Sequence, residues 1–157
     1  MGSPLTSQTL SDQAALGSGL SSSELLRLSG LARQAAELGG HELSQRFGRL
    51  EQVREKGRCG DLVTEADHAA EAAVLDLLQR ETPEIGVIAE ESGRREAPGD
   101  LEWCVDPLDG TTNYAHGFPF FGTSIGLTWK GIPLLGALAA PALRELFWAA
   151  PGLGSWC

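Results

Sequence analysis

Apolar residues recur at helical spacing in two stretches of the first half of the chain. From Ser23 they occupy every third or fourth position as far as Gly39-Gly40, and a second set follows the same period from about Thr64 to Arg80. Residues three and four apart share one face of a helix, so two amphipathic helices are predicted. The first should close at the glycine pair or continue toward Phe47, and Pro83 should end the second. The positions expected to be buried are Leu25, Leu28, Leu31, Ala35 and Leu38, then Ala66, Ala69, Ala70, Ala73, Val74, Leu77 and Leu78.

Shorter apolar runs follow, with the length of strands. Residues 85–89 lead into Glu90-Glu91, and residues 101–105 lead into Asp106. Both runs are predicted to be strands that place acids at their carboxyl ends. One further short strand is expected at 52–56. Short joins between three longer runs predict an antiparallel meander, formed by residues 121–129, 132–140 and 144–149.

The two ends of the chain lack these patterns. Residues 1–22 are rich in serine and glycine and contain a single charge, Asp12, which predicts a disordered leader with order beginning near Ser22. Residues 151–157 are turn-like, and no closing helix follows them. We therefore expect residues 23–157 to be the N-terminal portion of a domain that is truncated at its C-terminal end.

Composition limits the partners of the chain. Its formal net charge of −9 argues against binding to nucleic acid or to an anionic membrane, and a protein this acidic needs cations to hold a phosphate. The three cysteines show no metal-ligand spacing and no secretory signal precedes them, so a cytoplasmic setting is expected. The longest uncharged apolar stretch, 131–143, contains two prolines and is shorter than the roughly 20 residues that cross a bilayer. No membrane segment is predicted.

The residues around Pro107 suit a metal site. Pro107 fixes its own φ and pushes Asp106 toward an extended conformation, so the strand should stop there and turn. Asp106 and Asp109 could then converge on one point. Two carboxylates and the backbone carbonyl of Leu108 form the hard oxygen set that magnesium prefers.

A short helix is predicted to begin directly after this turn, at Thr111-Thr112-Asn113. Its free N–H groups would face the same point as the carboxylates, and a helix N-terminus favours phosphate. Gly110 would let the backbone approach that ligand closely. The loop is therefore expected to hold a metal ion and a phosphate together.

Each acidic feature also has a purely structural interpretation. Asp109-Gly110 alone would commonly form a turn, and Glu90-Glu91 alone would be a pair of solvated charges. Asp61 could cap the second helix instead of taking part in catalysis, and Asp67 is interpreted as a structural residue on the first turn of that helix. The surrounding segments favour a site at Glu90 and Asp109, whereas spacing alone leaves both roles open for Asp61.

Residues 106–113, with the sequence Asp-Pro-Leu-Asp-Gly-Thr-Thr-Asn, resemble the signature of the inositol monophosphatase family. Residues 61–67 (Asp-Leu-Val-Thr-Glu-Ala-Asp) and 88–92 (Ile-Ala-Glu-Glu-Ser) resemble two further family elements in the same order. The resemblance extends over residues 23–157. It implies an α/β fold, the layered αβαβα sandwich of the inositol monophosphatase or sugar phosphatase type, of which this chain would hold only the N-terminal α+β half.

The same resemblance implies a role for each site residue. Mg²⁺ would be bound by Glu90, Asp106, the carbonyl of Leu108 and Asp109. The substrate would be bound by Glu90, Leu108, Asp109, Gly110 and Thr111. Asp61 and Thr111 would orient and activate the attacking water, as the catalytic pair.

The implied activity is magnesium-dependent hydrolysis of a small phosphate monoester, with myo-inositol phosphate and water giving inositol and phosphate. Histidinol phosphate and other small polyol or sugar phosphates are alternative substrates, and the family resemblance allows a homodimer. The family's Trp-Asp element, which completes the metal site, is absent from this sequence. A second hypothesis is therefore a truncated, non-catalytic remnant that acts as a metal-binding or interaction protein. Reading the gene past Cys157 would separate the two hypotheses.

Overall fold

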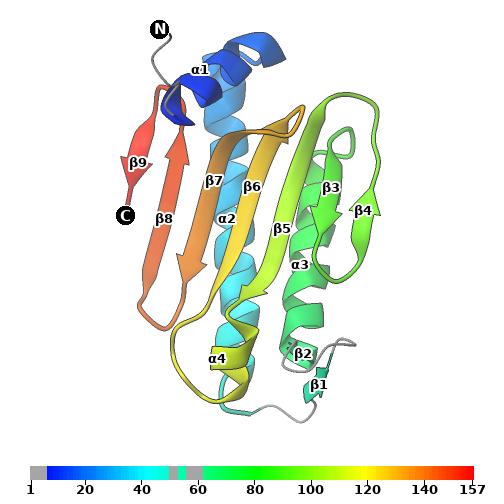
Figure 1. Cartoon of the computed structure of the whole chain (residues 1–157), viewed down its shortest axis with the longest axis vertical. Coiled ribbons are helices and arrows are strands. Elements are labelled where there is room, and N and C mark those ends of the chain that lie inside the picture. Colours follow the sequence, from blue (N-terminus) through cyan, green and yellow to red (C-terminus); the bar gives the residue numbers. More distant parts are fainter. Residues whose placement is uncertain (1–6, 50–52, 56–61) are drawn as a thin grey trace, which may run out of the picture.

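Two helices lie side by side on one face of a seven-stranded sheet in the computed structural model of the chain (Figure 1). The structure describes residues 7–49, 53–55 and 62–157. The helices are α1 (Ser7–Ser18), α2 (Ser22–Arg46), α3 (Glu65–Glu81) and α4 (Thr111–Ala115). The strands are β1 (Val53–Glu55), β2 (Leu62–Thr64), β3 (Gly86–Ala89), β4 (Gly93–Arg95), β5 (Leu101–Asp109), β6 (Gly122–Trp129), β7 (Ile132–Ala140), β8 (Glu145–Ala150) and β9 (Gly154–Trp156).

The strand order of the large sheet is β4-β3-β5-β6-β7-β8-β9. Strand β3 is parallel to β5, and every other pair of neighbours is antiparallel. The predicted meander is confirmed as β6, β7 and β8. A second sheet contains only β1 and β2, and β1 confirms the expected short strand over the three residues of it that the structure describes.

Helix α2 continues through the glycine pair, which was one of its two predicted ends. It begins with a capping box between Ser21 and Glu24 and ends at Arg46. A Cβ at Gly39 would lie 2.6 Å from Cγ2 of Thr123, and one at Gly40 would lie 3.3 Å from Cβ of Ala139. The glycines therefore bring the helix close to strands β6 and β7, and they do not act as a helix stop.

Helix α3 matches its predicted range and buried face. Thr64 caps its N-terminus and Thr82 follows its last residue. A single large apolar core joins α2 and α3 to the sheet. Of the positions expected to be buried on α3, Ala69 and Ala73 are half-buried, and the others are buried: Ala66, Ala70, Val74, Leu77 and Leu78.

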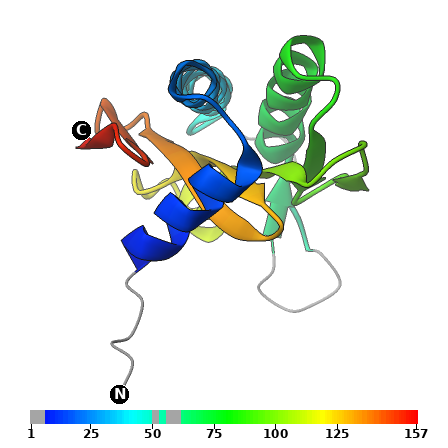
Figure 2. The same cartoon turned by 90° about the horizontal axis from the view of Figure 1, so that it is seen from above.

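The N-terminal segment differs from the disordered leader that its composition predicted. From Ser7 onward it forms helix α1, which lies across one end of the sheet and reaches its other face (Figure 2). Ala14 is 1% exposed, and a Cβ at Gly17 would lie 2.7 Å from the Trp129 ring. Small side chains thus let α1 pack closely on the sheet. A serine- and glycine-rich composition does not indicate such packing.

Strand β5 also runs further than predicted, because it continues past Asp106 as far as Asp109. Its pairing with β6 is irregular between Asp106, opposite Ser124, and Asp109, opposite Gly122. Pro107, which cannot donate a ladder hydrogen bond, falls in this irregular stretch. Three short strands were not predicted, namely β2 directly before α3, β4 after Glu90-Glu91, and β9 within the turn-like C-terminal residues.

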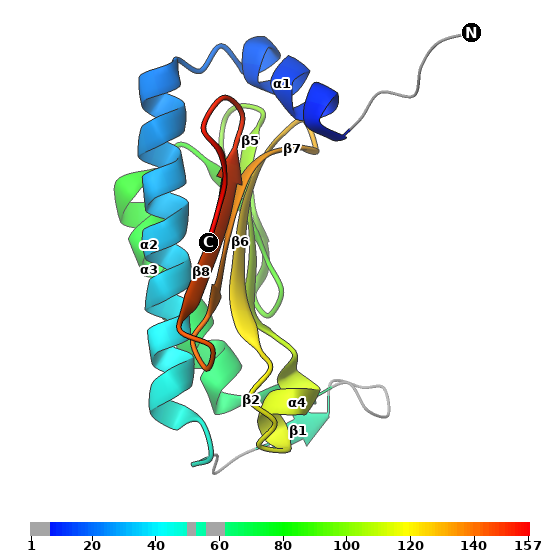
Figure 3. The same cartoon turned by 90° about the vertical axis from the view of Figure 1, so that its left-hand side faces the viewer.

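Viewed along the sheet edge, α2 and α3 cover one face of the strands, and α4 lies at the opposite end of the sheet from α1 (Figure 3). The carboxyl ends of β3 and β5 point toward the α4 end of the sheet (Figure 1). None of the helices in the described part of the chain is both long and apolar enough to span a bilayer.

Candidate active site

The parallel pair β3 and β5 brings two acidic segments together. Ala89, the last residue of β3, is paired with Val105, and the backbone N–H of Glu90 donates a 3.1 Å hydrogen bond to the Val105 carbonyl. Glu90 therefore leaves β3 beside Asp106. This arrangement of strand ends is the one that the two apolar runs predicted.

The electrostatics of Asp106 show that three carboxylates act on one another here. Burial raises the pKa of Asp106 to about 7 from its ordinary 3.8, and a hydrogen bond with Glu90 and the charges of Glu90 and Asp109 add to the rise. A half-buried carboxyl group among like charges prefers to keep its proton. Glu90 and Asp109 are more exposed than Asp106. A cation at this point would reverse the preference and favour three ionised side chains.

The donor atoms here suit a hard cation, because all of them are oxygens. Within the described residues, no three His, Cys, Asp or Glu side chains form a ready-made metal cluster. Magnesium commonly binds through one or two carboxylates and retains several waters. Asp106, Asp109 and Glu90, with the nearby Leu108 carbonyl, supply oxygen donors of this kind.

The expected helix after the aspartates is confirmed as α4, five residues long. Gly110 precedes it with φ of 89°, and a Cβ there would lie 2.9 Å from the carbonyl oxygen of Phe120. Only glycine meets both conditions without strain. The Thr111 hydroxyl donates to the Leu108 carbonyl at 3.0 Å, which ties the start of α4 to the backbone that carries the two aspartates.

A second, smaller apolar core packs against the loop that carries Asp106 and Asp109. The side chain of Leu108 is buried in it, and the Tyr114 hydroxyl donates a 2.6 Å hydrogen bond to the carbonyl of Leu43. The Thr123 hydroxyl donates to the Pro107 carbonyl at 2.9 Å. The other members of this core are Leu43, Ala66, Ala70 and Phe121. The aspartate loop is therefore held by packing and buried hydrogen bonds, although its charged groups lie nearer the surface.

Two buried acids of α3 hold backbone or side-chain groups of the site. Asp67, fully buried, accepts from the backbone N–H and the hydroxyl of Thr64, which confirms its predicted structural role. Its other oxygen accepts from the Thr111 hydroxyl at 3.3 Å, a contact that sequence reasoning missed. Glu71 was missed entirely, although an acid among the alanines of the buried helix face was a signal for it.

Asp61, the proposed partner of Thr111, lies outside the described residues, so its position is not assigned. Cys104 is half-buried on β5, and burial raises the pKa of its thiol. A thiol held in its neutral form is a poor nucleophile, which agrees with chemistry centred on the acids.

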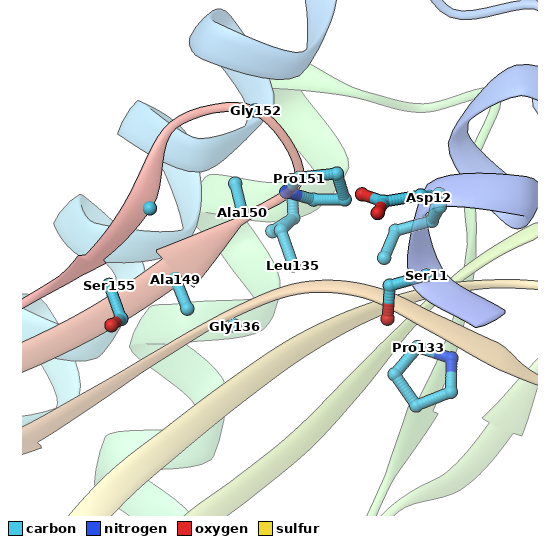
Figure 4. Close-up of a pocket in the computed structure, with 12 residues that line it drawn as sticks. Ser11, Asp12, Pro133, Leu135, Gly136, Ala149, Ala150, Pro151, Gly152 and Ser155 are labelled. Carbon is cyan, nitrogen blue, oxygen red and sulfur yellow. The ribbon is translucent and has the colours of Figure 1, made fainter. Parts of the chain in front are cut away.

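A hollow of about 610 Å³ lies at the other end of the sheet, between α1 and the turn that joins β8 to β9 (Figure 4). Its walls are formed by Pro133, Leu135, Gly136, Ala150 and Pro151 together with Ser11 and Asp12 of α1. Asp12 is its only titratable lining residue among the described part of the chain. The hollow therefore lacks the convergent polar groups that the ends of β3 and β5 provide.

Comparison with known proteins identifies the family of the chain. The family model of the inositol monophosphatase family matches residues 24–157. An inositol-1-monophosphatase from Synechocystis is 44% identical over 126 residues, which cover 80% of this chain and 44% of that protein. A fructose-1,6-bisphosphatase/inositol-1-monophosphatase from Aquifex aeolicus is 37% identical over 128 residues, which cover 80% of this chain and 48% of that protein.

Solved structures confirm the predicted fold type. The extragenic suppressor protein SuhB from Bartonella henselae superposes with a TM-score of 0.79 at 36% identity, over 83% of this chain and 51% of that one. The inositol monophosphatase from Anabaena gives a TM-score of 0.72 at 38% identity, over 84% of this chain and 47% of that one. The chain thus spans about half the length of the relatives that it matches. It belongs to the inositol monophosphatase family.

Proposed function

We propose that this chain supplies the metal-binding half of a magnesium-dependent phosphatase that hydrolyses small phosphate monoesters. The observation that carries the proposal is the mutual influence of three carboxylates, Glu90, Asp106 and Asp109, at the ends of β3 and β5. The family match supports the same activity. Because the chain spans about half of its relatives, the activity is proposed for the complete polypeptide.

In this proposal, magnesium is held by Glu90, Asp106, Asp109 and the Leu108 carbonyl. When bound, the ion supplies Lewis-acid polarisation of the phosphate and makes a neighbouring water a stronger nucleophile at neutral pH. The protein's task is to keep the acids ionised and correctly placed. The buried Leu108 side chain and the hydrogen bond from Thr123 to Pro107 support that placement.

Thr111 is proposed to orient the attacking water. Its hydroxyl hydrogen is directed to the Leu108 carbonyl and to Asp67, so its oxygen lone pairs remain able to accept a hydrogen bond from water. Asp61 is proposed to accept the proton of that water. The water oxygen then bonds to phosphorus, the ester P–O bond breaks, and the departing alcohol oxygen takes up a proton.

The proposed substrate is an inositol monophosphate, with a small sugar phosphate or histidinol phosphate as alternatives. The names of the two curated relatives support the first two, since one is called an inositol-1-monophosphatase and the other a fructose-1,6-bisphosphatase/inositol-1-monophosphatase. All three esters present the same phosphate to the same cation. A substrate panel with equal magnesium would rank them by kcat/KM.

Phosphate release is the direct test of the proposed activity. The gene should be read past Cys157, and the 157-residue chain and any longer in-frame product should be assayed with and without magnesium. We expect magnesium-dependent release of phosphate from the longer product. Absence of release by both lengths, for every ester of the panel, would overturn the enzymatic proposal and favour a metal-binding remnant.

The proposal also covers compartment and assembly. A cytoplasmic location is supported by free Cys104 and Cys157 in the described part of the chain. A homodimer is proposed for the complete protein from the family resemblance. Light scattering coupled to gel filtration would give the mass of the assembly, and a monomer mass would contradict the dimer.

A further inference from the structure

We propose that Asp67 and Glu71 of α3 are positioning residues that fix the distance between the metal-binding end of β3 and the start of α4. The two acids are not metal ligands in this scheme. Each one instead holds a different loop of the site. The inference rests on the proposed function for its catalytic consequence, although its structural part concerns only this chain.

Glu71 holds the backbone directly after Glu90. Its side chain is 4% exposed, and its two oxygens accept separate hydrogen bonds from the N–H groups of Glu91 at 2.8 Å and Ser92 at 2.9 Å. Ser92 lies 21 positions after Glu71 in the sequence, so the contact links two distant parts of the chain. A buried carboxylate with both oxygens used in this way fixes the direction in which Glu90 leaves β3.

Asp67 holds the start of α4 in a similar manner. One oxygen accepts from the backbone N–H of Thr64 at 2.8 Å and from its hydroxyl at 2.6 Å. The other oxygen accepts from the Thr111 hydroxyl at 3.3 Å. Thr111 also donates to the Leu108 carbonyl. Its hydroxyl therefore connects Asp67 of α3 with the backbone that carries Asp106 and Asp109.

The two acids lie four residues apart on one helix, so their side chains are neighbours on the same face, about 5–6 Å apart at Cβ. Helix α3 packs against β5 and α2 and cannot flex between these positions without disturbing the large core. It therefore sets the spacing of the two loops as a rigid element. A metal ion and a phosphate that must be bound together need that spacing to be constant.

A purely stabilising role for both acids is the competing interpretation, and ligand binding separates the two. In the 157-residue chain, Glu71→Gln leaves one oxygen to serve two N–H groups. We expect the dissociation constant of Mg²⁺ to rise about 10- to 100-fold, the usual cost of losing a group behind a metal ligand. Asp67→Asn should leave Mg²⁺ affinity within about twofold and weaken the binding of inorganic phosphate, at saturating Mg²⁺, by about 10-fold or more.

Thr82→Val is the matched control. Thr82 is fully buried just beyond the other end of α3, and its hydroxyl accepts a 3.0 Å hydrogen bond from Nε1 of Trp103. Its loss should lower the melting temperature without changing either dissociation constant. Glu71→Asp, which keeps the charge but shortens the side chain, provides a second variant if Glu71→Gln does not fold. It should also weaken Mg²⁺ binding.

Titration calorimetry of the four variants decides between the interpretations. Mg²⁺ affinity that is unchanged in both Glu71 variants, or losses that follow melting temperature equally in all four, would overturn the inference. The outcome is independent of turnover. If the complete protein lacks activity but the variants show the expected changes in affinity, the proposed function is overturned and this inference stands. If the complete protein is active but the affinities do not change as expected, the inference is overturned and the proposed function stands.

Discussion

The two ends of the seven-stranded sheet have opposite characters. At the end formed by β3, β5 and α4, charged and polar groups are crowded together, and a raised pKa of Asp106 is one result. At the α1 end lies a hollow of about 610 Å³, but glycine, proline, alanine and leucine form most of its walls. The comparison shows that open space and clustered titratable groups lie at different places in this chain.

The difference also concerns how each end is stabilised. The hollow is bordered by ordinary apolar packing, such as that of buried Leu134 and Leu135. The acidic end holds Asp106 in an environment that disfavours its ionised form. The ionised form of such a carboxyl group becomes favourable when a cation binds beside it. Substitutions at the acidic end should therefore change ligand binding, whereas substitutions at the hollow should change stability alone.

The largest expected effect is that of Asp109→Asn. Removing this charge should lower magnesium-dependent turnover of the complete enzyme by more than about 100-fold, since a ligand matters at least as much as the groups behind it. Asp100→Asn is the control, because Asp100 lies just before the other end of β5, where its carboxylate forms an exposed ion pair with Lys130 at 3.5 Å. Wild-type rates for Asp109→Asn would mean that the site is misplaced.

The second expected effect is a pH dependence of magnesium binding. The folded-state pKa of Asp106, about 7, exceeds its ordinary 3.8, so protonation stabilises the metal-free fold below pH 3.8, and that contribution is lost as the pH rises through about 7. Magnesium needs the ionised group, so its affinity should fall about tenfold per pH unit below about 7. Calorimetry in two buffers of different ionisation enthalpy would count the released protons. An affinity that is constant from pH 8 to 6 would contradict the assigned role of Asp106.

A smaller effect is expected at the turn into α4. Gly110→Ala places a Cβ at φ of 89° and 2.9 Å from the Phe120 carbonyl. The backbone conformation alone should cost about 1–2 kcal/mol, and displacement of α4 should weaken phosphate binding further. Gly117→Ala shares a positive φ, 73°, with no atom within 4 Å of the added carbon. Equal behaviour of the two variants in urea unfolding and phosphate titration would argue against a tight Gly110 contact.

The smallest effect on the acidic end is expected from Leu135→Ala at the hollow. Leu135 is buried, so its truncation should lower the free energy of unfolding by about 2–5 kcal/mol. Magnesium affinity should nevertheless stay unchanged at temperatures well below the melting point. A parallel loss of magnesium binding in calorimetry would show that the two ends of the sheet are energetically coupled.

Sequence periodicity predicted most of the fold because the elements that pack in the large core carry strong patterns. Helix α3 and the strands β3, β6, β7 and β8 follow them closely. The wrong predictions fall at small residues, which can either interrupt an element or let it pack closely against another. Gly39 serves close packing in α2 where a helix stop was one expectation, and Ala14 and Gly17 let α1 pack against the sheet where a disordered leader was expected.

Prediction of the loop that carries Asp106 and Asp109 has a different basis. Residues 106–113 combine proline, aspartate and glycine at spacings with few structural alternatives, and the expected α4 is confirmed there. The magnesium ligands and the catalytic pair remain predictions. The links from Asp67 to Thr111 and from Glu71 to Ser92 depend on tertiary contacts over 44 and 21 residues. No local pattern encodes such distances.

The most direct measurement is an anomalous difference map from crystals of this chain grown with Mn²⁺, which accepts the oxygen ligands that Mg²⁺ prefers. We predict a peak between the carboxylates of Glu90, Asp106 and Asp109, near the Leu108 carbonyl. A map with these side chains ordered and no peak among them, or with the cation bound elsewhere, would contradict the account.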